Sequence, residues 1–174
     1  MFHNALAKTH LGRHARRALR LLRRVNRESD LLLDAGVGEA PYHAFMRGRI
    51  IGLDIHLTPL TSIVGNVEAL PFMGSVFTGA CAMQSLYLLH RPERGVAEIF
   101  RVLKPGGWLV FSVSRPAAAR QQQLEHPTLR FIIWDRKKWA NLFRSAGFCD
   151  QTPWWERWLL SRVGAYYFAL FVKI

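Results

Sequence analysis

The chain has 174 residues, and half of them are hydrophobic, which suits one folded domain with a sizeable core and argues against disorder. Lysine and arginine outnumber the acidic residues 24 to 12, and the net charge of +12 is unusual for a small-molecule enzyme. The only cysteines, Cys81 and Cys149, lie far apart, which favours buried thiols in a reducing compartment over a disulfide framework. The seven histidines show no metal-ligand spacing, so we expect no metal site. No apolar run reaches the roughly 18 residues of a membrane-spanning helix, and we expect a cytoplasmic protein.

The first predicted element is a basic amphipathic helix over residues 7–27, within a leading segment that we place at 1–28. Leucines and alanines recur there at helical spacing among arginines, with no acidic residue before Glu28. Three interpretations stay open: a leading helix packed on the domain, a peripheral contact with an anionic membrane through residues 8–27, and a nucleic-acid contact. The segment lacks an apolar core of the kind found in secretory signals, and it runs into the next element without a linker, which disfavours a mitochondrial presequence.

Short apolar strands alternate with helices in the rest of the chain. Strands are predicted at 30–34, 49–54, 63–65, 77–83, 108–113, 148–160 and 165–173. Helices are predicted at about 40–47, 91–103 and 136–146. This pattern predicts an α/β fold, a Rossmann-like doubly wound and mostly parallel seven-stranded sheet, with helices on both faces and a C-terminal antiparallel hairpin. We expect a single domain over 1–174, in which 114–134 has no clear period and is an insertion that covers the site as a lid.

Two glycines directly follow the first predicted strand, in the run Asp34-Ala35-Gly36-Val37-Gly38. Glycines let the backbone turn sharply and approach a ligand closely. Asp54 ends the second predicted strand, where a carboxylate can accept hydrogen bonds from both ribose hydroxyls. The sequence therefore predicts a cofactor that contains a nucleoside. A dinucleotide such as NAD fits poorly, because Pro41 occupies the last glycine position of that fingerprint.

Four segments resemble one enzyme family in the family's own order, and one of them is the second predicted strand with Asp54 at its end. The pattern that begins at Asp34 resembles the first motif of class I S-adenosylmethionine-dependent methyltransferases. Asn66–Phe72 resembles the D-A-E-x-L-P-F stretch of the small ubiquinone-type, or type 11-like, members, and Arg101–Gly107 matches their R-V-L-K-P-G-G turn. The resemblance spans residues 30–115 and implies S-adenosylmethionine as the cofactor. The cofactor-binding residues that we take from it are Asp34, Ala35, Gly36, Gly38, Asp54, Ile55, Asn66, Val67, Glu68 and Gln84.

The resemblance also implies separate roles for these residues. Asp34 would organise the glycine loop and the amino group of the cofactor, and Asp54 would take the ribose. Asn66 stands where the family usually has Asp, near the adenine, and Val67 would meet the adenine through its backbone. Gln84 follows the fourth strand and would either orient the substrate or cap the loop. The acidic positions that the family has after Phe72 are missing here.

Methyl transfer from a sulfonium mainly requires alignment, and a general base is needed only if the acceptor must lose a proton early. His90 and His126 are the candidate catalytic residues. Tyr87, Trp134, Trp154 and Trp155 would line an apolar acceptor pocket or, alternatively, pack in the core.

The sequence as a whole favours methyl transfer to a small or lipid-linked acceptor. A narrower resemblance, through His126–Phe131 and Trp139–Phe148, is to a bacterial branch that often accompanies cell-envelope biosynthesis. Two alternatives remain: a non-catalytic module that keeps the methyltransferase fold, and a nucleic-acid methyltransferase. The sequence leaves the oligomeric state open.

Overall fold

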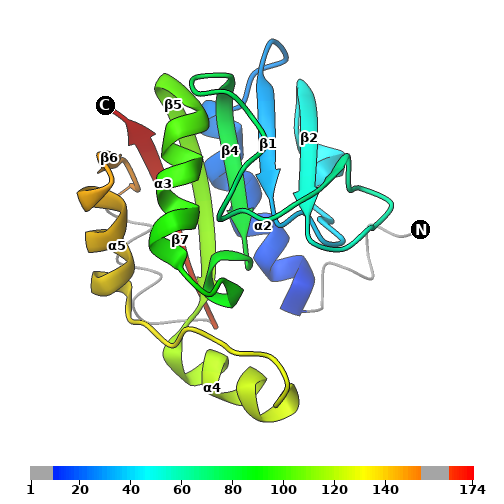
Figure 1. Cartoon of the computed structure of the whole chain (residues 1–174), viewed down its shortest axis with the longest axis vertical. Coiled ribbons are helices and arrows are strands. Elements are labelled where there is room, and N and C mark those ends of the chain that lie inside the picture. Colours follow the sequence, from blue (N-terminus) through cyan, green and yellow to red (C-terminus); the bar gives the residue numbers. More distant parts are fainter. Residues whose placement is uncertain (1–9, 154–164) are drawn as a thin grey trace.

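A seven-stranded sheet forms the middle layer of the computed structural model, which describes residues 10–153 and 165–174, with side chains from Ala18 onward. The strand order is β3-β2-β1-β4-β5-β7-β6 (Figure 1). Strands β1 to β5 are parallel, whereas β7 runs antiparallel to both β5 and β6. The strands are β1 Leu31–Ala35, β2 Arg49–Asp54, β3 Ile63–Val64, β4 Phe77–Met83, β5 Leu103–Ser114, β6 Phe148–Asp150 and β7 Tyr166–Lys173. The predicted Rossmann-like architecture and its antiparallel C-terminal strands are thereby confirmed.

Helices cover both faces of this sheet. Helix α2 (His10–Val25) contacts β5 and β7 on one face, and α3 (Pro92–Val102) and α5 (Arg136–Ser145) pack on the other (Figure 1). Successive side chains of a strand point to opposite faces of the sheet, so each strand contributes to two hydrophobic cores, one on each face. Leu33 belongs to the core on the α3 side, and its neighbour Leu32 belongs to the core on the α2 side. No helix in the described part of the chain is long and apolar enough to span a membrane.

Helix α2 is amphipathic over the part whose side chains are described, from Ala18 onward. Ala18, Leu21 and Leu22 are buried against the sheet, while Arg20 and Arg23 are exposed. Burial of the apolar stripe fixes the helix on the domain, and the arginine face remains turned toward solvent.

Several predicted elements differ in the structure. Strand β5 begins at Leu103, whereas the predicted strand begins at residue 108. The helix predicted at 40–47 is only a 3-10 turn, η1 (His43–Phe45). The stretch 114–134, for which no regular element was predicted, contains helix α4 (Pro116–Glu125). Pro116 starts this helix, because its fixed φ suits the first helical position. Helix α4 could not be predicted from hydrophobic periodicity because the helix has no apolar stripe. Ala119 is its one buried residue.

The end of the chain agrees only in part with the prediction. Strand β6 ends at Asp150, whereas a longer strand over 148–160 was predicted. Residues 154–160 of that prediction, which include Trp154 and Trp155, lie outside the described residues. The predicted bounds of β2 and β4 match the structure.

Candidate functional site

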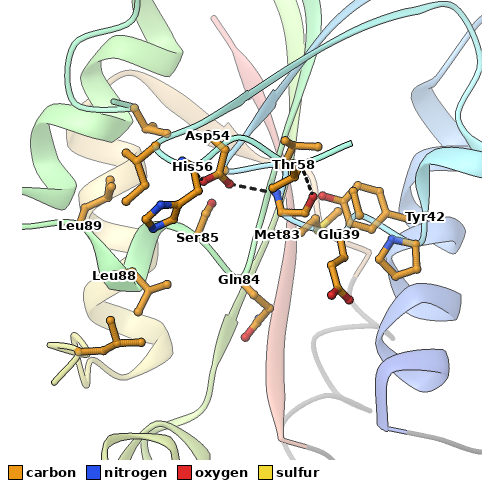
Figure 2. A pocket seen from close by; sticks show the side chains of 18 of the residues that line it. Glu39, Tyr42, Asp54, His56, Thr58, Met83, Gln84, Ser85, Leu88 and Leu89 are labelled. Atoms are coloured by element: carbon orange, nitrogen blue, oxygen red, sulfur yellow. Dashed lines mark hydrogen bonds between the residues drawn. The ribbon is translucent and has the colours of Figure 1, made fainter. Parts of the chain in front are cut away.

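A cavity of about 740 Å³ opens where β1, β2 and β4 end. This is the edge at which open parallel sheets bind ligands. Figure 2 shows Leu88 and Leu89 on one side of the cavity and Glu39 and Tyr42 on the other. The walls are the glycine loop 36–42, Asp54–His56, Thr58, Val67, Met83–Ser85, Leu88–His90, Thr128–Arg130 and Tyr166.

The two glycines of the loop have different surroundings. Both have positive φ, +83° at Gly36 and +48° at Gly38. A Cβ on Gly36 would lie 2.3 Å from the Cβ of Ser85, whereas a Cβ on Gly38 would meet nothing within 4 Å. The hydroxyl of Ser85 also donates to the carbonyl of Ala35 at 2.6 Å. Gly36 therefore lets two loops of the protein approach each other, and Gly38 keeps space open at the cavity.

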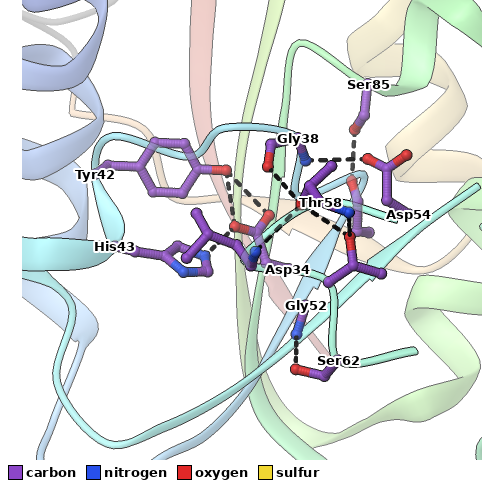
Figure 3. Close-up of polar contacts among 12 residues, drawn as sticks. Asp34, Gly38, Tyr42, His43, Gly52, Asp54, Thr58, Ser62 and Ser85 are labelled. Atoms are coloured by element: carbon purple, nitrogen blue, oxygen red, sulfur yellow. Dashed lines mark hydrogen bonds and ion pairs between the residues drawn. The ribbon is translucent and has the colours of Figure 1, made fainter. Parts of the chain in front are cut away.

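Asp54 braces this loop from the end of β2. Its Oδ2 accepts a hydrogen bond from the backbone nitrogen of Gly38 at 3.0 Å (Figure 3). Its Oδ1 accepts one from His56 N at 3.0 Å. The hydroxyl of Thr58 adds a bond to the carbonyl of Gly38 at 3.1 Å. Because each carboxylate oxygen has more than one lone pair, Asp54 can still accept hydrogen bonds from a ligand in the cavity.

Asp34 is fully buried and does not line the cavity. The hydroxyl of Tyr42 donates to its carboxylate at 2.8 and 3.0 Å, and His43 Nε2 lies 2.6 Å from Oδ2 (Figure 3). Burial raises the pKa of Asp34, and the contacts with His43 and Tyr42 oppose that rise. Burial and the nearby Asp34 in turn raise the pKa of Tyr42 well above its usual value. The carboxylate thus holds the end of the glycine loop and the start of η1, and it does not line the cavity in which we expected the amino group of a cofactor.

The segment after β3 contributes one cavity residue. Val67 is buried and lines the cavity, but Asn66 is exposed and lies outside it. Asn66 Oδ1 accepts from the backbone nitrogen of Glu68 at 2.8 Å, and Glu68 Oε1 accepts from Arg91 N at 2.9 Å, just before α3. The predicted residues Asn66, Glu68 and Ala35 therefore support the site from outside the cavity wall, whereas Ile55 lines it.

The two motifs that follow in the sequence are joined through α3. The guanidinium of Arg101 donates to the carbonyls of Leu70 and Phe72 at 3.1 and 2.8 Å. Glu98 binds the same guanidinium at 2.7 Å and accepts from Leu70 N at 2.8 Å. Hydrogen bonding to Arg101 lowers the pKa of Glu98. This pair therefore fixes the Leu70–Phe72 segment, and with it the neighbouring Val67 wall.

Gln84 has an unusual backbone at the end of β4. Its φ is +58°, uncommon for a residue other than glycine, and its backbone nitrogen donates to the carbonyl of Ser112 at 2.9 Å. Its side-chain amide lies between two hydroxyls: Nε2 donates to Ser112 Oγ at 3.2 Å, and Ser114 Oγ donates to Oε1 at 2.8 Å. Strained backbone of this kind concentrates at functional sites. Gln84 lines the cavity in a fixed orientation.

The two histidine candidates separate in space. His90 lines the cavity, but His126 is exposed and is not among the lining residues. His56, Thr58, Leu129, Arg130 and Tyr166 also line the cavity, although none of them was predicted as a site residue. His56, Thr58 and Tyr166 lie in no motif, and Leu129 and Arg130 belong to the segment of the narrower resemblance. Tyr87, a candidate for the acceptor pocket, is instead a buried core residue that stacks on Phe131. The described part of the chain contains no group of three His, Cys, Asp or Glu residues that could hold a metal ion.

The chain is similar to known methyltransferases in sequence and in fold. Residues 33–111 match the family model of the methyltransferase domain Methyltransf_11. This match, together with the shared fold described below, supports a class I S-adenosylmethionine-dependent methyltransferase of the type 11 family. The matched methyltransferase domain supports S-adenosylmethionine as the cofactor. The matched segment carries the glycine loop, Asp54 and Gln84, but not Leu129 or Arg130 on the far wall of the cavity.

Solved methyltransferase structures share the fold. A methyltransferase in complex with the Haloferax volcanii Trm112 activator has a TM-score of 0.74 at 22% identity, over 93% of this chain and 91% of the other. An S-adenosylmethionine-dependent methyltransferase from Mesorhizobium loti has a TM-score of 0.70 at 15% identity, over 97% and 100%. The Burkholderia thailandensis 1,6-didemethyltoxoflavin-N1-methyltransferase, with its substrate and S-adenosylhomocysteine bound, has a TM-score of 0.69 at 18% identity, over 92% and 78%.

A curated relative matches a shorter part of the chain. The biotin biosynthesis bifunctional protein BioHC of Teredinibacter turnerae is 34% identical over 53 residues. That alignment covers 30% of this chain and only 9% of BioHC.

Proposed function

We propose that this protein transfers the methyl group of S-adenosylmethionine to a small or lipid-linked acceptor with an apolar body. The observation that carries the proposal is one cavity with two unlike walls. One wall has the glycine loop and Asp54, and the other has Leu88, Leu89 and Leu129. A cofactor and an acceptor bound side by side in this cavity would meet with their reacting atoms held in place.

The cofactor wall fits a nucleoside. Asp54 retains acceptor capacity for ribose hydroxyls, the open space at Gly38 admits close approach, and buried Val67 offers an apolar surface to a base. When bound there, S-adenosylmethionine supplies an electrophilic methyl group on its sulfonium. The residues of the chain then have to orient the two molecules and exclude water.

The acceptor wall suits an apolar body with a polar reacting group. Leu88, Leu89 and Leu129 would cover the body of the acceptor, and the fixed amide of Gln84 would orient its polar group by hydrogen bonding. His90 on the same wall would take up a proton from acceptors that must lose one early. His126 would need a rearrangement of its loop to do so, because it is outside the lining.

The proposed setting is the cytoplasmic face of an anionic membrane during cell-envelope biosynthesis, with residues 8–27 as the contact. Exposed Arg20, Arg23 and Arg24 on α2 support this, because each such charge near an anionic bilayer contributes about 1 kcal/mol. Flotation with anionic and neutral vesicles tests it, with Arg16, Arg20, Arg23 and Arg24 changed together to Gln. Salt-dependent binding to RNA but not to vesicles would instead favour a nucleic-acid methyltransferase.

A non-catalytic module with this fold is the second candidate. It is favoured by Asn66 in place of Asp and by the missing acids after Phe72. The side chain of Asn66, however, accepts a hydrogen bond from the backbone nitrogen of Glu68 within its own turn. Asn66 does not line the cavity that would hold the cofactor. The substitution therefore leaves the cavity lining unchanged, which supports an active enzyme.

Calorimetric titration with S-adenosylmethionine and S-adenosylhomocysteine tests the proposal first. We expect saturable binding of both and no comparable binding of NADH. A membrane extract incubated with methyl-labelled cofactor should then yield labelled product with the wild-type protein. A variant whose cavity is disrupted should yield none. Cofactor binding with no labelled product from any extract would support the non-catalytic module.

A further inference from the structure

A second cavity of about 330 Å³ lies at the other end of the sheet. It is lined by Arg23, Asn26, Arg27, Phe45 and Arg47. These segments lead into the amino ends of β1 and β2, whereas the methyltransferase cavity lies at their carboxyl ends. No residue is shared between the two cavities.

The arginines are brought together by a tightly built turn. Asn26 is only 7% exposed, and its Oδ1 accepts from Arg47 N at 2.7 Å while its Nδ2 donates to Arg47 O at 2.9 Å. Gly48 has φ +85°, and a Cβ there would lie 2.4 Å from Asp30 O and 3.2 Å from Arg27 O. The backbone of Arg47 is therefore held directly against the turn that carries Arg27.

The lining is cationic, since none of its five residues is acidic. The carboxylate of Asp30 lies next to this lining and holds the turn: Oδ2 accepts from Arg27 N at 2.6 Å and from Asn26 Nδ2 at 3.1 Å, and Oδ1 accepts from Thr78 Oγ1 at 2.9 Å. Glu28 approaches Arg47 only at 4.0 Å, and its side chain is 84% exposed. Three guanidinium groups around one cavity repel each other, and a bound anion would offset that repulsion.

We propose that this cavity binds a phosphate group, either of an anionic lipid headgroup or of a water-soluble phosphate compound. Guanidinium groups match phosphate oxygens with paired, charge-assisted hydrogen bonds. Phe45 lies at the same cavity and is 41% exposed, which suits a headgroup region where aromatic rings rest at the interface. The site does not depend on methyl transfer, because it is separate from the methyltransferase cavity.

The decisive experiment compares two double variants with the same loss of charge. Arg27→Gln/Arg47→Gln removes two arginines of the cavity but leaves α2 unchanged. Arg94→Gln/Arg144→Gln removes two exposed arginines on α3 and α5. The probes are vesicles of phosphatidylcholine with and without phosphatidic acid, measured by co-sedimentation, and inorganic pyrophosphate, measured by calorimetry.

We expect wild-type protein to bind phosphatidic acid vesicles or pyrophosphate, and the cavity variant to bind at least about tenfold more weakly. The control variant should stay within about twofold of wild type, which is below 0.5 kcal/mol. Binding to vesicles alone identifies a lipid headgroup as the source of the phosphate, and binding to pyrophosphate alone identifies a water-soluble compound. Equal weakening in both variants, or no wild-type binding to either probe, overturns the proposal.

Two further measurements keep the interpretation clear. Thermal unfolding should show the same midpoint for both variants, since all four arginines are exposed. Both variants should also bind S-adenosylhomocysteine like the wild type, so a failure of the methyltransferase assignment would be seen separately.

Discussion

Asp54 and Gly38 are 16 residues apart, and the carboxylate of Asp54 accepts a hydrogen bond from the backbone nitrogen of Gly38 at 3.0 Å. The residue that ends β2 therefore holds the loop that follows β1. Asp54 would thus contact a ligand directly and also hold the glycine loop in the shape that the ligand contacts. Changes at Asp54 should consequently affect both the ribose contact and the order of the loop.

Asp54→Ala should weaken binding of S-adenosylhomocysteine by about 1.5–3 kcal/mol, the range for a hydrogen bond to a charged group. Asp54→Asn should lose less, because one acceptor oxygen remains for Gly38 or for the ribose. Calorimetry on both variants gives the comparison. Wild-type affinity in Asp54→Ala would show that the ribose lies elsewhere.

The two loop glycines should respond differently to substitution. Gly36→Ala forces a Cβ to within 2.3 Å of the Ser85 Cβ and strains a positive φ, so it should lower the free energy of unfolding by about 2–4 kcal/mol. Gly38→Ala meets no protein atom within 4 Å, so its cost to stability should be only about 1–2 kcal/mol, from the positive φ. Urea unfolding measures both effects.

Cofactor affinity should fall in Gly38→Ala, because its Cβ enters the space that the ligand would use. The sequence alone assigned both glycines to the cofactor. The structure places Ser85 directly beside Gly36, so this glycine also serves the packing of the protein itself. Unchanged affinity in a folded Gly38→Ala protein would remove this glycine from the cofactor cradle.

The coupling between Glu98 and Arg101 should depend on pH. Hydrogen bonds, first of all from Arg101, lower the pKa of Glu98 below its usual 4.5. The carboxyl of Glu98 therefore binds a proton less tightly in the folded protein than in the unfolded chain. The pair contributes its full stabilisation above the usual pKa of 4.5, and it loses this contribution as the pH falls through the lowered pKa of the folded state. A double-mutant cycle with Glu98→Gln and Arg101→Gln should give about 0.5–1 kcal/mol near pH 7, because the pair is partly exposed.

The same cycle repeated at about pH 3 should give a smaller coupling energy. Urea unfolding of the four proteins at each pH supplies the numbers. A coupling energy that is constant with pH would mean that Glu98 acts only through neutral contacts. Because the pair holds Leu70 and Phe72, loss of the coupling should also weaken cofactor binding through Val67.

The strands and the cofactor side of the cavity were predictable from the sequence because each depends on local signals. Apolar runs mark β2 and β4, and the glycine pair and Asp54 stand directly after strands. The contacts of Asp34 were not predictable, since Tyr42 and His43 reach it only through the fold of the turn between them. The arginine cavity was hidden for the same reason: Arg27 and Arg47 are neighbours only because Gly48 allows close packing.

The acceptor side was the least predictable part. Helix α4 has no apolar stripe, and Leu129 and Arg130 lie in an irregular stretch after it, outside the family match. Their place at the cavity depends on tertiary contacts. Ile132 N donates to the carbonyl of Tyr87 at 2.7 Å, and this bond joins the stretch to the segment that follows β4.

The stretch 126–131 should act as a cover whose attachment depends on Gln123. Its Nε2 donates to the carbonyl of Leu129 at 2.6 Å, and its Oε1 accepts from Phe131 N at 3.0 Å, so one side chain of α4 holds both ends of the segment that carries Leu129 and Arg130. Gln123→Ala removes both bonds, and hydrogen exchange in 126–131 should become faster. Affinity for S-adenosylhomocysteine should stay within about twofold, because the cofactor wall is on the other side of the cavity.

Gln121→Ala is the matched control, since the side-chain amide of Gln121 donates to Glu125 on the same helix at 2.9 Å. It should leave exchange in 126–131 unchanged. In wild type, exchange there should slow when cofactor product and an acceptor are both bound, because the acceptor would contact Leu129. Protection in the free protein equal to that of the central strands would contradict a mobile cover, and the acceptor would then have to enter beside His90 and Leu89.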